Sequence, residues 1–147
     1  MGLFSRKKKE VQLVTTEPLV VGYDAVFEAA DIKPTGKWKD EVVQDKRAQD
    51  ILTFVFGGQD EHGRMNETAA LVRLTFAPTS TDKTAIKVTV AGLTVGYIYK
   101  EDKSHISPKV KAFGTTATCM AGWGGGYINS AGEAVPLQLR MDLARKA

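Results

Sequence analysis

The clearest hydrophobic pattern lies in the second half of the chain, where apolar and polar residues alternate. In 70–76, Val72, Leu74 and Phe76 would share one face of a strand, while the residues between them point the other way. Alternation of this kind is typical of a strand that is buried on one side only. The same criteria predict further strands over 85–90, 94–99, 117–121 and 137–142.

Two of these strands are expected to pair directly. Ala91-Gly92 occupies the position of a two-residue hairpin turn, which requires positive φ angles. The returning strand carries Val95, Tyr97 and Tyr99 on one side. A polar turn over 78–82 would connect the preceding pair of strands.

The first half of the chain predicts helices. After a short apolar run over 19–21, Asp24 can cap a helix that extends to Ala30. Over 38–56 the apolar residues recur largely at helical spacing, with a strand over 51–56 as the alternative, and Gly57-Gly58 is a stop signal. The polar stretch 101–114, with Pro108 at its centre, suits a short helix with its connections.

Together these elements predict a β-rich α+β fold. We expect a small open barrel or curved sheet of about five to six strands with one or two helices. The predicted organisation is a polar tail over 1–17, one domain over 18–143 and a short basic end over 144–147.

Charge is distributed unevenly along the 147 residues, whose formal net charge is +3. Arg6 to Lys9 and Arg145-Lys146 place six cations at the ends, which leaves 14 cations against 17 acids in the body. The basic ends predict solvated termini or contact with an acidic partner such as nucleic acid. No apolar run is long enough to span a membrane, and the single Cys119 fits a reducing compartment, so we expect a cytoplasmic protein.

The segment 85–98 resembles the central signature of HIRAN domains. Ala85-Ile86-Lys87-Val88 is followed by a tight turn and by Gly92-Leu93-Thr94-Val95-Gly96-Tyr97-Ile98, which is similar to the family's Gly-x-x-Val-Gly-Tyr/His-Ile segment. The resemblance extends over about 68–143. It implies an OB-like barrel that binds single-stranded DNA or DNA ends, partly through an Asn-Pro-Tyr-Asp-x-Asn turn. This chain keeps only Asp82 of that turn and has Thr81 and Thr84 in place of Tyr and Asn.

The candidate nucleic-acid residues are therefore Asp82, Lys83, Lys87, Tyr97 and Lys100. Each also has a structural interpretation. Asp82 can be a turn carboxylate that accepts a hydrogen bond from the backbone two residues further on. Tyr97 can pack against its strand neighbours, and the lysines can form a solvated strand edge.

A second hypothesis is a structural protein of a phage particle or another bacterial assembly, which would be found in the virion rather than free in the cytoplasm. It would contact protein neighbours through the glycine-rich segment 122–127, with Trp123 and Tyr127 as aromatic anchors. The alternative for this segment is a simple hairpin or bulge.

The sequence predicts no catalytic residues, no cofactor and no metal site. His62 and His105 lack His, Cys or carboxylate neighbours at metal-ligand spacing. Cys119 lies in an apolar strand, where an unreactive thiol is expected. We therefore expect a non-enzymatic binding protein.

Overall fold

The computed structural model describes residues 14–36, 40–56, 69–124 and 127–143. Six antiparallel strands close into a barrel in the order β1-β4-β3-β2-β5-β8. The barrel strands are β1 (Asp40–Gln44), β2 (Ala70–Phe76), β3 (Ile86–Val90), β4 (Leu93–Ile98), β5 (Thr116–Gly124) and β8 (Gln138–Met141). The described helices are α2 (Tyr23–Ala29), α3 (Ala48–Phe56), the 3-10 helix η1 (Lys100–Asp102) and α4 (Lys103–Lys111).

The predicted β-rich α+β class and the OB-like barrel are confirmed. The barrel is closed rather than open, because β8 pairs with both β5 and β1. The alternating residues point as expected: Val72, Leu74, Leu139 and Met141 are buried in one core inside the barrel. Ala91 and Gly92 adopt φ angles of 51° and 85°, as the predicted β3–β4 turn requires.

The predicted helix over 38–56 is wrong in its first half. Asp40–Gln44 forms β1, with Val42 buried and Val43 exposed, and only Ala48–Phe56 is helical. The alternative strand over 51–56 is also wrong. β1 pairs with β4 and β8, so the hydrogen bonds that close the barrel override the local helical spacing. Between the two elements, Asp45 turns the chain by accepting a hydrogen bond from the Arg47 backbone N–H.

Two details at the N-terminal side also differ from expectation. The run 19–21 makes only an isolated bridge, Val21 to Ala70, instead of a full strand. Helix α2 begins after Gly22, and no side chain caps it, so Asp24 lies in the first turn rather than at the N-cap. An acidic residue there still faces the positive end of the helix dipole.

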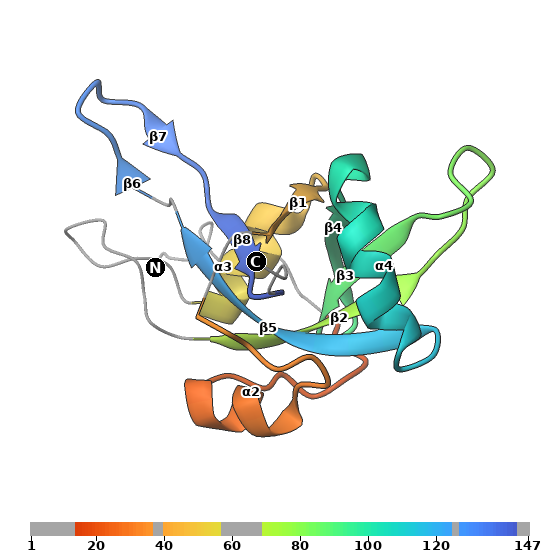
Figure 1. The fold of residues 1–147 in the computed structure, drawn as a ribbon. Helices are drawn as coiled ribbons and strands as arrows, with labels where there is room; N and C mark the ends of the chain where they lie inside the picture. Colours follow the sequence, from red (N-terminus) through yellow and green to blue (C-terminus); the bar gives the residue numbers. More distant parts are fainter. Residues whose placement is uncertain (1–13, 37–39, 57–68, 125–126, 144–147) are drawn as a thin grey trace.

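The helices cover different parts of the barrel (Figure 1). Since β1 and β4 are antiparallel, α3, which follows β1, and α4, which follows β4, lie toward opposite ends of the barrel. Both contribute side chains to the main core, including Leu52 and Val110. Helix α2 lies outside the wall, where Val26 packs with Met120 of β5 in a second, smaller cluster.

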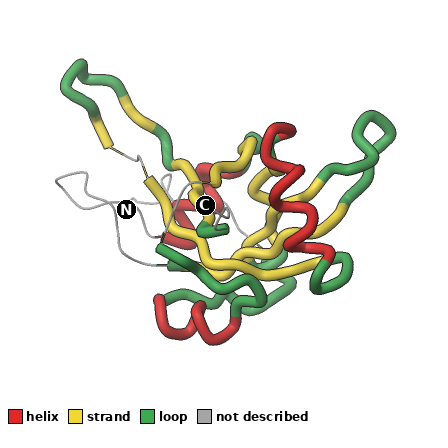
Figure 2. The backbone as a smooth tube through the Cα atoms, viewed as in Figure 1, coloured by secondary structure: helices red, strands yellow, loops and turns green. Residues whose placement is uncertain are grey.

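A short hairpin extends from the barrel between β5 and β8 (Figure 2). It consists of β6 (Tyr127–Ile128) and β7 (Ala134–Val135), which pair only with each other. Its tip is ordered by Asn129, whose Oδ1 accepts hydrogen bonds from the N–H groups of Ala131 and Glu133.

Several sequence predictions lie outside the described residues. These are the basic runs at 6–9 and 145–146, the first two residues of the helix predicted over 38–56, the Gly57-Gly58 stop signal and His62. No helix in the described part of the chain is both long and apolar enough to cross a membrane.

Candidate functional site

The strand register places one row of side chains across the outer wall of the barrel. Val43 of β1 lies opposite Tyr97 of β4, Tyr97 lies opposite Lys87 of β3, and Lys87 lies opposite Thr75 of β2. We call these four residues the wall row. Val43 and Tyr97 are 46% and 38% exposed. An aromatic ring, a cation and a hydroxyl therefore stand side by side on an accessible surface.

Positive charge is concentrated in the segment that carries this wall. Residues 83–111, which comprise β3, β4, η1 and α4, contain six lysines and only two acids, Glu101 and Asp102. The rest of the described chain holds five Lys and Arg residues and eleven acids. The excess of acids outside the two ends of the chain therefore conceals a basic segment at 83–111. Sequence reasoning missed it because the charge was summed over all of these residues together.

The other predicted lysines lie outside the wall row. Tyr99 and Lys100 follow β4 directly and are exposed, and Lys83 is exposed at the end of the β2–β3 turn. Lys87 and Tyr97 are directly opposite partners on neighbouring strands, whereas Lys83 lies in the β2–β3 turn and Lys100 begins η1.

Asp82 is held by its own turn, as its structural interpretation predicted. Its Oδ1 accepts hydrogen bonds from the backbone N–H and the hydroxyl of Thr84, and its Oδ2 pairs with the Lys103 ammonium of α4. The Lys103 hydrogen bond, followed by that from the Thr84 N–H, lowers the pKa of the Asp82 carboxyl below its usual value. Asp82 therefore links the β2–β3 turn to α4.

The predicted aromatic anchors of the glycine-rich segment need correction. Trp123 lies within β5 and is completely buried. The centroid of its ring is 6.2 Å from that of the Phe56 ring. It is a core residue and offers no surface to a partner. Tyr127 begins β6, and its side chain lies outside what the structure describes.

Cys119 is buried on β5. Burial, with smaller contributions from the charges of Asp40 and Asp142, raises the pKa of its thiol far above the usual range. We expect the native protein not to react with a thiol reagent such as dithionitrobenzoate at neutral pH, and to release one equivalent of chromophore after denaturation. Stoichiometric labelling of the folded protein within minutes would contradict this burial.

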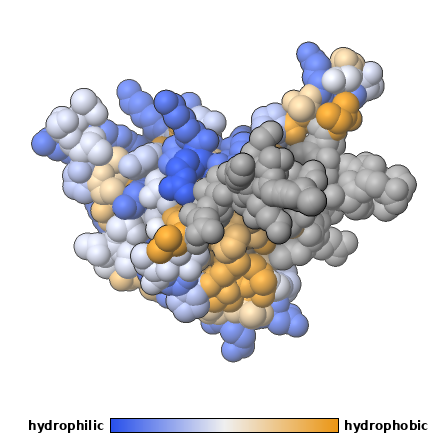
Figure 3. Space-filling view, turned by 180° about the vertical axis from the view of Figure 1, so that it is seen from behind, coloured by the Kyte–Doolittle hydropathy of each residue, from blue (hydrophilic) through white to orange (hydrophobic). Residues whose placement is uncertain are grey.

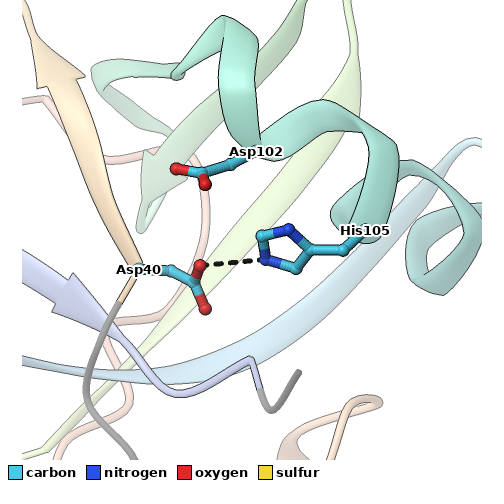
Figure 4. Close-up of side chains that lie close together, drawn as sticks. All are labelled: Asp40, Asp102 and His105. Atoms are coloured by element: carbon cyan, nitrogen blue, oxygen red, sulfur yellow. Dashed lines mark hydrogen bonds and ion pairs between the residues drawn. The ribbon is translucent and has the colours of Figure 1, made fainter. Parts of the chain in front are cut away.

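A separate group of three side chains lies at the α4 end of the barrel. Asp40, the first residue of β1, is buried, and its Oδ1 is 3.0 Å from Nε2 of His105 on α4. Asp102 at the end of η1 lies beside them, and all three side chains point toward one another (Figure 4). Asp102 lies three residues before His105, so the expectation that this histidine has no carboxylate neighbour at ligand spacing is wrong. Asp40 gave no sequence signal, because it lies far away in the chain.

The buried Asp142 at the end of β8 is satisfied separately. Its carboxylate accepts hydrogen bonds from the Thr35 N–H and hydroxyl and from the Gly36 N–H. It therefore anchors the chain after α2 to the barrel.

The chain matches no protein-family model, and neither a curated protein nor a solved structure shows significant similarity to it. Function must therefore be argued from the residues themselves, and the resemblance to HIRAN domains stays a prediction.

Proposed function

We propose that the protein binds single-stranded DNA on the outer wall of the barrel, along the wall row. The observation that carries this proposal is the direct pairing of Tyr97 with Lys87 on two strands of the lysine-rich segment 83–111. A tyrosine ring can stack on any base, and the adjacent ammonium can contact the phosphate that follows it. No catalytic step is part of this proposal.

The proposed site differs from the one that the HIRAN resemblance implies. In the corresponding turn, Thr81 offers no ring for stacking, and Asp82 is engaged by Thr84 and Lys103. The wall row and the neighbouring Lys100 keep the aromatic and cationic groups that a single strand requires. The proposal therefore retains the ligand class and moves the main contact from the turn to β3 and β4.

The test is a fluorescence-anisotropy titration with labelled single-stranded DNA at two salt concentrations, with free and blocked 3′ ends. We expect binding that weakens as salt increases, because phosphate contacts release counterions. Tyr97→Ala should weaken binding about 5- to 150-fold, which corresponds to the ~1–3 kcal/mol of one base stack. Lys87→Ala should also reduce the salt dependence.

Matched controls distinguish the wall from non-specific attraction. Tyr23→Ala removes an exposed tyrosine of helix α2. Lys33→Ala removes a cation that lies over the ring of Phe27, a residue of the same helix. Both should bind like the unmodified chain. If deleting residues 1–10 abolishes binding while Tyr97→Ala leaves it unchanged, the basic tail is the binding element and the wall proposal is wrong.

A second candidate function, a component of a phage particle or another protein assembly, is favoured by exposed apolar side chains. Ile128 on the extending β6–β7 hairpin is 66% exposed, and the stacked Tyr23 and Phe27 of α2 are also accessible. Figure 3 shows a hydrophobic patch on the face turned away in Figure 1. Absence of DNA binding in the titration would favour this candidate, with the virion in place of the cytoplasm as the location.

A further inference from the structure

We propose that Asp40, Asp102 and His105 form a binding site for one divalent transition-metal ion of the Zn²⁺ or Mn²⁺ type. Each residue offers one ligand atom, and these atoms all lie within 4.8 Å of one another. Ligand atoms around tetrahedral zinc are roughly 3.3 Å apart, given bond lengths of about 2.0–2.1 Å. The hydrogen bond between His105 Nε2 and Asp40 Oδ1 is 3.0 Å long and close to that spacing, so a bound ion would replace the shared proton, and the Asp102 ligand atom lies within 4.8 Å of both.

Two ordered elements hold the three ligands in place. Asp40 is fixed by its pairing with Met141 of β8 at the barrel closure. Asp102 and His105 are three residues apart, so they lie on one face of the η1–α4 segment. Helix α4 is itself anchored by Ile106 and Val110, which are buried in the core. The backbone at the site is thus positioned by the barrel rather than by free loops, which favours preorganised binding.

The surroundings of the cluster also suit a cation. The Asp40 side chain is only 1% exposed, whereas that of His105 is 22% exposed, so the site is dry on the barrel side and open toward solvent. In such a low-dielectric setting the attraction between a carboxylate and a metal ion is strengthened.

The ligand types determine which metal is expected. Two carboxylate oxygens with one imidazole nitrogen suit Zn²⁺, Mn²⁺ or Co²⁺. Calcium prefers six to eight oxygen ligands, and Mg²⁺ is usually held by carboxylates and water, so neither needs the imidazole. Three protein ligands would leave coordination positions for water or for an anionic group of a partner. The inference is independent of the nucleic-acid proposal, because none of the three residues belongs to the wall row.

The test is isothermal titration of the full, untagged chain with Zn²⁺ and separately with Mn²⁺, after removal of metals with a chelator. We expect a stoichiometry of one for at least one of the two ions. His105→Ala and Asp102→Asn should each weaken metal binding at least about 10-fold, because even the loss of a residue that only supports a metal ligand costs about that much affinity. His62→Ala, which removes the other histidine, is the matched control and should bind normally.

Three outcomes would overturn the inference. They are no binding of either ion, binding that His105→Ala and Asp102→Asn leave unchanged, and binding of Ca²⁺ or Mg²⁺ alone. Should His105→Ala fail to fold, Asp102→Asn decides, because Asp102 lies at the helix start outside the core. Co²⁺ gives an independent measurement: its visible absorption should change on addition to the unmodified protein and remain that of free Co²⁺ with Asp102→Asn.

Discussion

Gly96→Ala should destabilise the protein by more than ~3 kcal/mol or prevent folding. A Cβ atom at position 96 of β4 would overlap the backbone carbonyl of Val43 on β1. A backbone group cannot move aside as a flexible side chain can, so the β1–β4 pair would have to separate. This pair closes the barrel, and its loss would expose the core. Urea denaturation followed by circular dichroism measures the change in unfolding free energy.

Gly114→Ala provides the matched control for this prediction. Gly114 has a φ of 113° but open space around the position of a Cβ atom, so its substitution adds backbone strain without a collision. A cost of about 1–2 kcal/mol is expected there. A Gly96→Ala protein as stable as Gly114→Ala would show that β1 and β4 do not approach as closely as described.

Trp123→Ala should cost about 3–5 kcal/mol of stability, the range for removing a large aromatic side chain from a core. Trp123 is completely buried and packs near Phe56 of α3, so its loss would leave a cavity between β5 and the helix. Thermal and urea denaturation would measure the loss. Phe113→Ala, at a residue 51% exposed after α4, should change stability by less than ~0.5 kcal/mol.

The Trp123 result also separates the two interpretations of the glycine-rich segment. A surface anchor could be removed with little loss of stability, and only binding to a partner would suffer. If Trp123→Ala were as stable as the unmodified protein, the tryptophan would have to be exposed, and the assembly hypothesis would regain its anchor.

The two proposed sites lie on different parts of the barrel. The wall row depends on the outer face of strands whose inner face fills the core, and it therefore follows from strand alternation. The metal site depends on the end of the barrel, where the start of β1 meets the helix after β4. Tyr97→Ala and Asp102→Asn should thus affect DNA binding and metal binding separately.

Local chemistry alone determined strands β2, β3, β4, β5 and β8 and the turn between β3 and β4. Side chains alternate in a strand whatever its partner, so Val72, Leu74 and Leu139 revealed their buried face directly in the sequence. The Ala91-Gly92 turn and the hydrogen bond between Asp82 and Thr84 likewise involve neighbours in the chain. The β-rich class and a small barrel or curved sheet followed from these short-range patterns, whereas the closure of the barrel did not.

Only the tertiary structure decided features that depend on residues distant in sequence. The stretch from Asp40 to Gln44 became a strand because β4 and β8 supply its hydrogen bonds, against its helical spacing. Trp123 became a core residue because α3 covers it, although its glycine neighbours suggested a surface loop. Asp40 met His105, and Val43 came to lie beside Tyr97 in the wall row, only once the barrel had closed. Such contacts depend on pairing and packing across the whole domain, and no local spacing encodes them.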